Sequence, residues 1–489
     1  MSVFRRAGVI PERLWPLQLG TWSFQQGDLG TLVDDLPLRL LLLGLALGIQ
    51  AYQEIPLELT NALLGLGGAN LVSFLTMALS LTCICLAISP RLPGWAYGKV
   101  GVVLGRVALF ACLALALLGI RQVVVMVEMS FQAPVYYNDG TLLDHNAAAL
   151  LLDGRNPYTD SDIVSAIRNF HQPAKFTTPL QQGKLLHQQA YPTPDQLSAL
   201  LAQEPAGHPN QVLEFESHVS YPALAFLALV PLVWAGAPTV LPFYLLCLAV
   251  LAVIGLRAVR RELRWWLALL FLADIPVLNS VIAGDLDVFY ILLLFLAWLT
   301  WRRWWVSAVF MGLALASKQI AWFYLPFYLI FLYQRRGWRD TALRLSVASA
   351  LFLAINLPFI LLNSGAWLSG VLAPMRDPMF PEGAGIIALS VGKLVPFLPR
   401  EVYTTLEGLG MVGALLWYWR SGRQRPEAAM VLAILPLFLA WRSLSTYFYF
   451  CVLPAALLLA LSRGLNTQET GESRAAPDRA EAEPVQLAV

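Results

Sequence analysis

Long apolar runs occupy about half of this chain and limit what it can fold into. A helix crosses the hydrocarbon core of a bilayer with ~20 apolar residues. About twelve runs come near that length, at 38–53, 68–89, 101–127, 238–256, 265–283, 286–301, 304–319, 321–333, 341–363, 403–420, 427–441 and 446–462. Only 13% of the residues are charged, against roughly 25% in soluble proteins. The sequence therefore predicts an all-α, polytopic membrane protein of about 12 transmembrane helices, and excludes a soluble enzyme, a disordered protein and a nucleic-acid-binding protein.

Basic residues predict the orientation of these spans. The short connections 90–100, 257–264, 302–303, 335–339 and 420–425 hold fourteen Lys and Arg in thirty-two residues, whereas the connection 54–67 holds none. Basic loops face the cytoplasm in most membrane proteins. A complete crossing at 218–236 would place the basic segment 257–264 outside, so we expect a re-entrant or interfacial helix there. Both termini are then cytoplasmic.

This topology divides the chain into four predicted parts. A cytoplasmic segment and the first three spans occupy 1–127, and a large extracytoplasmic loop with amphipathic helices near 141–153 and 195–203 occupies 128–217. The membrane core occupies 218–463 and contains a second outer loop at 364–402. Residues 464–489 are rich in Ala, Glu, Arg and Pro, a composition that predicts a disordered cytoplasmic tail.

The positions of the cysteines, the N-terminal arginines and the histidines argue against disulfides, a cleaved signal and a metal site. All five cysteines lie in apolar runs, so a disulfide framework is not expected. Arg5 and Arg6 are followed by Pro11 and Glu12 rather than by an apolar stretch, so we expect a signal anchor rather than a cleaved signal. The five histidines lie within 145–218 without His-x-x-x-His spacing, and no metal or other cofactor is expected.

Ionisable residues gather on the predicted outer side of the spans. A charge at the centre of a membrane helix costs roughly 2.5–3.5 kcal/mol, so each such residue needs a reason. The residues that share this side are Asp139, Asp144, Asp285, Asp287, Lys318, Arg376, Asp377 and Arg442. Their convergence predicts a functional site at the outer face.

Segments at this face resemble motifs of known enzymes. Residues 136–158 (YYNDGTLLDHNAAALLLDGRNPY) resemble the first outer loop of family 87-like polyprenol-phosphate mannosyltransferases, where an acidic residue precedes a helix ending in a Gly-x-Asn-Pro-Tyr turn. SYPAL at 220–224 resembles their Tyr-Pro-Pro-Leu element, with Ala223 at the second proline. Residues 284–298 and 312–331 resemble the Gly-x-x-Asp turn and Lys-Gln segment of dolichyl-phosphate-dependent glucosyltransferases. All belong to the glycosyltransferase C superfamily, and the resemblance covers about 130–460.

The resemblance implies inverting transfer of a sugar, expected to be mannose, from a polyprenyl-phosphate donor to a lipid or glycan acceptor. The reaction would take place at the outer face of a bacterial-type plasma membrane, with membrane lipids as further partners and no nucleic acid. A carboxylate would accept the proton of the acceptor hydroxyl, and cations would stabilise the leaving phosphate. The implied residues are Asp139 and Asp144 as catalytic bases, Lys318, Arg442 and Arg376 as phosphate ligands, and Asp285, Asp287, His218 and Tyr221 as substrate contacts.

Each carboxylate also has a purely structural interpretation. Asp139 precedes a helical run and fits an N-cap. Asp144 fits a solvated residue in the first turns of that helix. Asp285 and Asp287 fit an exposed turn after Gly284, and a divalent ion between them is not favoured.

The cations have structural alternatives too. Lys318 follows an uncharged run and fits a side chain that reaches to the membrane interface. Arg376 fits an ion pair with Asp377. For the whole chain, the rival classes are a multi-spanning transporter or flippase and a non-catalytic relative. A transporter places its charges near the midplane between repeats, whereas here they favour one face and no repeat is evident.

Overall fold

The computed structural model describes residues 35–55, 57–132, 136–204 and 214–461. The predictions about a signal segment near Arg5 and Arg6 and about a disordered tail after 463 lie outside these ranges. The described chain is mostly helical and contains one sheet of two short strands. All five cysteines are free thiols.

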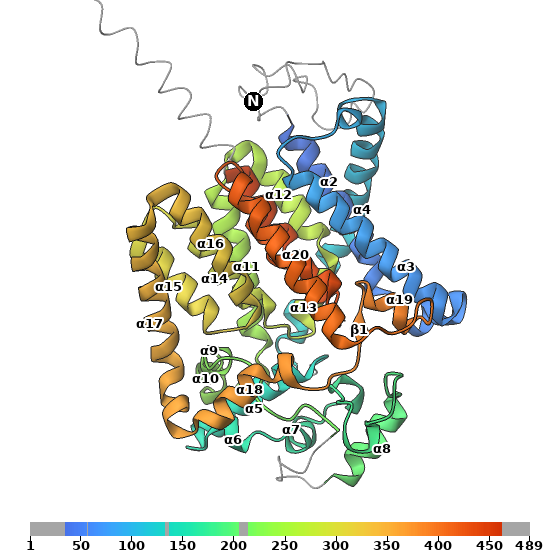
Figure 1. Cartoon of the computed structure of the whole chain (residues 1–489), viewed down its shortest axis with the longest axis vertical. Coiled ribbons are helices and arrows are strands. Elements are labelled where there is room, and N and C mark those ends of the chain that lie inside the picture. The colour runs from blue at the N-terminus through green and yellow to red at the C-terminus, as the bar shows by residue number, and fades with distance from the viewer. Residues whose placement is uncertain (1–34, 56, 133–135, 205–213, 462–489) are drawn as a thin grey trace, which may run out of the picture.

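A bundle of apolar helices forms most of the molecule (Figure 1). Its helices are α2 (Leu36–Gln50), α3 (Leu57–Ile88), α4 (Lys99–Met129), α11 (Leu241–Ala258), α12 (Arg261–Ala273), α13 (Ile275–Ile282), α14 (Asp287–Leu299), α15 (Trp304–Leu315), α16 (Ile320–Arg336), α17 (Trp338–Leu362), α20 (Arg400–Ser421), α21 (Ala429–Leu432) and α22 (Thr446–Tyr449). Short 3₁₀ helices join them, at η1 (Ala51–Glu54), η2 (Gly94–Tyr97), η6 (Pro426–Ala428) and η7 (Leu435–Leu439).

Five helical segments in the described ranges are long and apolar enough to cross a membrane, or six if the bent pair α12 and α13 is one span. They coincide with the first five predicted runs and with the run at 341–363, so these predictions are confirmed. The remaining runs form shorter apolar helices, such as the 12-residue α15. Others form helices such as α20, which is not among the helices that are both long and apolar enough to cross a membrane. The described structure therefore supports a multi-pass membrane protein, while the count of twelve spans stays a prediction.

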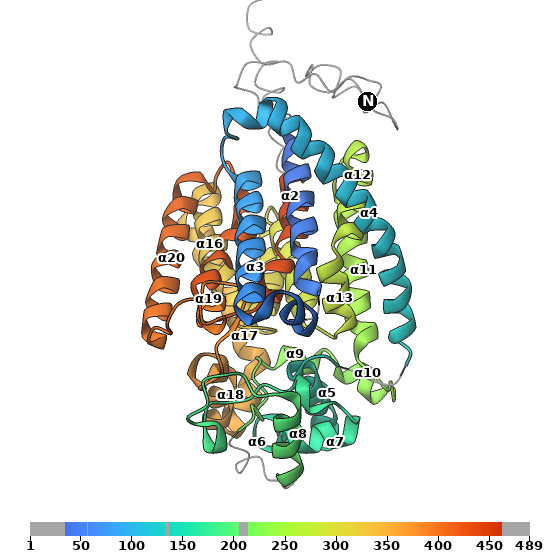
Figure 2. The same ribbon diagram turned by 90° about the vertical axis from the view of Figure 1, so that its right-hand side faces the viewer.

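A second group of elements covers one end of the bundle (Figures 1 and 2). These elements are α5 (Asp139–Leu152), α6 (Pro157–Asp160), α7 (Ile163–Phe170), η3 (Ala174–Phe176), η4 (Gly183–Leu185), α8 (Pro194–Gln203), α9 (Leu224–Leu227), α10 (Val230–Trp234) and α18 (Ser364–Arg376). Helix α19 (Ile387–Val391) lies beside α3 of the bundle (Figure 2). Helices α5 and α8 confirm the two helices predicted within 128–217. The segment 218–236 holds only α9 and α10, neither long enough to cross a membrane.

The basic connections meet at the opposite end of the bundle. Arg335 donates a hydrogen bond to the carbonyl of Arg423, and Arg425 donates to that of Pro90, so three of these connections touch one another. Arg344 of α17 donates to the carbonyl of Trp301, beside the connection 302–303. The structure thus separates the basic connections from the end that carries α5 and α18, as the charge pattern predicts.

Short backbone pairings hold the two predicted outer loops in place. Pro179 pairs with Phe215 within the first loop, and Leu180 pairs with Met379 of the second loop. Strand β1 (Glu382–Gly383) lies parallel to β2 (Arg442–Ser443), with Glu382 in register with Arg442. These short pairings bring the segment after α18 beside Arg442 and beside the loop that follows α7.

Candidate active site

Asp139 is the first residue of α5, and Asn138 before it caps the helix. The Asn138 side chain accepts a hydrogen bond of 2.8 Å from the backbone N–H of Thr141. The N-cap interpretation of Asp139 is therefore wrong, because that place is taken. The Asp139 carboxylate instead accepts a bond of 2.6 Å from the backbone N–H of Thr178, which fixes its direction.

The start of α5 is bound to the turn that precedes α14. The backbone N–H of Tyr137 and the side chain of Asn138 both donate to the carbonyl of Ala283, each at 3.2 Å. The hydroxyl of Thr141 donates to the carbonyl of Gly284. Gly284 has a φ of 89°, a conformation that favours glycine. The predicted convergence of Asp139 with the Gly-x-x-Asp turn is thus observed.

Asp287 and Lys318 form a buried ion pair next to this turn. Their side chains lie 2.8 Å apart, with exposed fractions of 2% and 8%. The exposed-turn interpretation of Asp287 and the interfacial interpretation of Lys318 are therefore both wrong. Asp285 is half-buried and lies within electrostatic range of Lys318.

Tyr221 links this ion pair to α5. Its ring lies 5.1 Å from the Lys318 ammonium, and its hydroxyl is so close to Gly140 that a Cβ atom there would approach it to 2.8 Å. The neighbouring Gln319 holds the Tyr221 segment, because its side-chain amide donates to the carbonyls of Ser220 and Val371. The Lys-Gln motif thus supplies one charged residue and one anchoring residue.

Asp144 lies inside the packed face of α5 and is 0% exposed, so the interpretation as a solvated residue is wrong. Neither of its carboxylate oxygens has a hydrogen-bond partner in the described part of the chain. Burial raises the pKa of Asp144 well above its ordinary value, with Lys318 opposing that change. Burial without a hydrogen-bond partner disfavours the charged form of this carboxyl group.

The pKa of Asp139 reflects a more balanced environment. Burial raises the pKa most, and the charge of Glu216 raises it further. Hydrogen bonds from Thr178 and the charge of Arg442 lower the pKa, but the net change is an increase. Arg442 therefore lies within electrostatic range of the Asp139 carboxylate. Of the two candidate bases, Asp139 has the hydrogen bond and the nearby cation that an ionised base needs.

Arg442 faces this group from β2. It donates to the Glu382 carboxylate at 3.2 Å and to the sulfur of Met379 at 2.8 Å, while its Nε is buried without a hydrogen-bond partner among the described residues. Tyr447 lies within electrostatic range of both Arg442 and Lys318. Arg442, Lys318 and Asp139 therefore belong to one neighbourhood.

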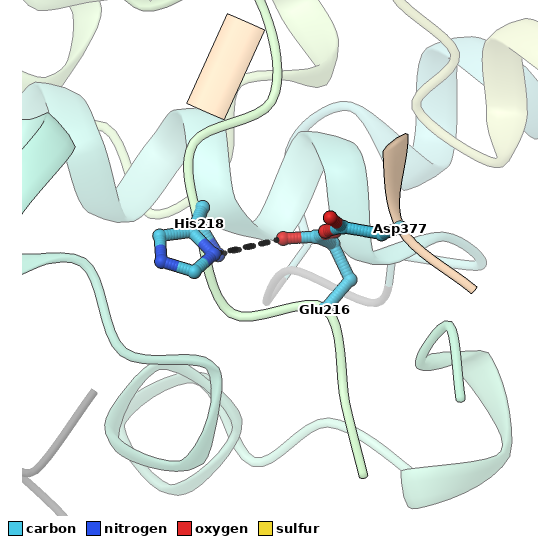
Figure 3. A group of neighbouring side chains, drawn as sticks. All are labelled: Glu216, His218 and Asp377. Atoms are coloured by element: carbon cyan, nitrogen blue, oxygen red, sulfur yellow. Dashed lines mark hydrogen bonds and ion pairs between the residues drawn. The ribbon is translucent and has the colours of Figure 1, made fainter. Parts of the chain in front are cut away.

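The structure does not bring Arg376 into this neighbourhood. Arg376 ends α18, is exposed, and makes no ion pair among the described residues, so the predicted pairing with Asp377 is not observed. Asp377 instead lies beside Glu216 and His218 (Figure 3). Burial and the neighbouring Glu216 raise the pKa of Asp377 to about 7. The bond with Glu216 raises the pKa of His218.

Three residues of the site were not singled out in the sequence. Glu216, Glu382 and Thr178 touch or face the predicted residues, yet none of them lies in a recognisable motif. Their contacts join segments that are far apart in the chain, and local spacing carries no signal of such contacts.

These segments can be compared with known proteins. Residues 219–441 match the model of glycosyltransferase family 87. The predicted resemblance to family 87 is therefore confirmed, and the family 87 match supports a membrane glycosyltransferase. No curated protein and no solved structure matches the chain. The family 87 match contains Tyr221, Asp287 and Lys318, whereas Arg442 directly follows it and Asp139 lies well before its start.

Proposed function

We propose that the chain transfers a sugar, expected to be mannose, from a polyprenyl-phosphate donor to a hydroxyl of a lipid or glycan acceptor. The observation that carries the proposal is the position of Asp139. Its carboxylate is fixed by Thr178, lies beside the turn with Asp287, and is within electrostatic range of Arg442. A base and a cation in one neighbourhood are what transfer from a phosphate-activated sugar requires.

In the proposed reaction the acceptor oxygen attacks the anomeric carbon of the donor. A bond forms between that carbon and the acceptor oxygen while the bond to the phosphate oxygen breaks, and polyprenyl phosphate leaves with the bonding electrons. Asp139 accepts the proton of the acceptor hydroxyl as the attack proceeds. A single displacement without an enzyme nucleophile inverts the anomeric configuration.

We assign the main phosphate contact to Arg442. Its Nε has no partner among the described residues, and its ion pair with Glu382 is only partly buried, with 18% and 43% of the side chains exposed. A phosphate can replace a partly exposed carboxylate at low cost, because such pairs contribute little net energy. The charge of Lys318 is already balanced by Asp287. Lys318 therefore supports the electrostatics of the site and holds Tyr221.

The proposed orientation follows from the separation of charge along the bundle. With the basic connections in the cytoplasm, α5 to α8 and α18 face the outside of a bacterial-type plasma membrane. Single cysteines at the exposed Asn169 and Arg261 test this in whole cells with an impermeant thiol reagent. We expect labelling at 169 and none at 261, and labelling at 261 would contradict the orientation.

The reaction itself is tested with the purified full-length protein, radiolabelled polyprenyl-phosphate mannose and a membrane lipid extract. We expect transfer of the label to an acceptor, and a 10²–10⁴-fold lower rate for Asp139→Asn, as is typical for loss of a general base. The matched control is Asp153→Asn, which alters an exposed carboxylate at the other end of α5. A near-wild-type rate for Asp139→Asn would contradict the role of Asp139.

A further inference from the structure

Glu216, His218 and Asp377 form a compact group of metal-ligand side chains that the proposed reaction does not use. One ligand atom from each residue lies within 4.8 Å of the other two. The Nδ1 of His218 lies 3.3 Å from a carboxylate oxygen of Glu216. Figure 3 shows the Asp377 carboxylate beside the Glu216 carboxylate, with the His218 ring on the other side of Glu216.

One carboxylate oxygen of this group is buried without a hydrogen-bond partner in the part of the chain that the structure describes. The Glu216 side chain is only 4% exposed, and its Oε2 has no hydrogen-bond partner among the described residues. Two carboxylates this close repel each other unless a proton or a cation lies between them. The imidazole of His218 is paired with Glu216 and lies within electrostatic range of Asp377. A dication bound to all three side chains would satisfy the free oxygen and compensate both carboxylates.

The segments around the group are held in place by backbone contacts. Glu216 donates its N–H to the carbonyl of Thr178, and the N–H of Gln181 donates to the carbonyl of Pro378. These backbone contacts hold the two ligand-bearing segments side by side without using the three ligand side chains. Preorganised ligands lose little freedom on coordination, which favours tight binding.

We propose that Glu216, His218 and Asp377 bind one divalent transition-metal ion, with Zn²⁺ as the best-fitting ion. Imidazole and carboxylate ligands suit Zn²⁺ and Mn²⁺, whereas Mg²⁺ and Ca²⁺ prefer oxygen ligands alone. Three protein ligands leave a further position for water. The ion joins the segment before α9 to the segment after α18, close to Asp139, and thereby stabilises the outer end of the site.

The spacing in the sequence does not reveal this group. Glu216 and His218 alternate along one extended segment, but Asp377 follows about 160 residues later. The segment around residues 178–181 joins the two, because it contacts residues 215–216 on one side and residues 378–379 on the other. For this reason the histidine spacing alone did not favour a metal ion.

Zinc binding is tested by calorimetry and elemental analysis of the full-length, tag-free protein in detergent after chelation. We expect one Zn²⁺ per chain, and an affinity ~10-fold or more lower in His218→Ala and Asp377→Asn. The matched control is His187→Ala, an exposed histidine of the same outer region, which should bind like the wild type. Size-exclusion profiles show whether each variant is folded.

A wild-type protein without saturable binding would overturn the proposal, and so would folded variants that bind Zn²⁺ like the wild type. Because binding is measured without turnover, this outcome is independent of the proposed transfer reaction. Cobalt provides a second readout, since Co²⁺ in a site with an imidazole ligand is expected to give a visible absorption band that His218→Ala abolishes. Absence of that band at a bound equivalent of Co²⁺ would remove His218 from the ligand set.

Discussion

The buried pair of Asp287 and Lys318 allows a quantitative test of the site. We expect Asp287→Asn to destabilise the protein strongly, because it leaves the Lys318 ammonium buried without a counter-charge. Lys318→Met should have a similar effect through the unpaired Asp287 carboxylate. The double variant removes both charges and should be more stable than either single variant.

The expected size follows from the geometry of the pair. Two unit charges 2.8 Å apart attract each other by about 6 kcal/mol at an effective dielectric constant of 20. Both side chains are more than nine-tenths buried, so each ion has also lost most of its hydration. Removal of one partner of such a pair typically costs ~3–5 kcal/mol, whereas removal of both is often neutral.

The assay is denaturant-induced and thermal unfolding of the purified protein in one detergent. The control is Asp160→Asn, which breaks the exposed pair with Arg155 and should change stability by only ~0–1 kcal/mol. If Asp287→Asn unfolds no earlier than Asp160→Asn, or if the effects of the two single variants simply add, the pair is not coupled as the structure indicates.

Three further predictions concern the rate and the fold. Burial raises the pKa of Asp139, and its basic form is lost as the pH falls through that pKa. The pH profile of kcat/KM should therefore begin to decline at a higher pH than the ordinary pKa of an aspartate would give. A profile that stays flat down to the ordinary pKa would contradict this. Arg442→Ala should raise the KM for the donor and lower kcat, with partial rescue in Arg442→Lys, whereas unchanged donor kinetics would exclude the phosphate contact. Gly284→Ala should lower the unfolding temperature, because φ is 89° and a left-handed conformation costs an L-residue roughly 1–2 kcal/mol; an unchanged temperature would argue against that turn.

The apolar pattern predicted the five long apolar helices and the bent pair, but not the breaks within the later runs. The runs at 38–53 and 341–363 became α2 and α17, and the segment 218–236 formed two short helices rather than a span. Hydrophobic length is a local property, so it can be read from a single sequence. The proximity of Asp139 to the turn at Gly284 was also predicted, because the topology inferred from the basic connections places both on the same side of the membrane.

The partners of the charged residues could not be predicted in the same way. Arg442 meets Glu382 only through the register of two short parallel strands, and Lys318 meets Asp287 only through the packing of α14 beside the loop before α16. The N-cap of α5 is Asn138 and not Asp139, so the expected cap was wrong by one position. Such contacts depend on tertiary packing, which overrides local preference.

The family 87 match begins after Asp139, so the assignment of the base depends on how α5 is held. The match does include the turn at Ala283 and Gly284, and three hydrogen bonds tie the start of α5 to that turn. A second constraint comes from Tyr221, which is inside the match and packs against Gly140. Asp139 lies between these two contacts. Its position is therefore fixed by residues of the matched segment, which supports the proposal that α5 supplies the base although α5 itself is outside that segment.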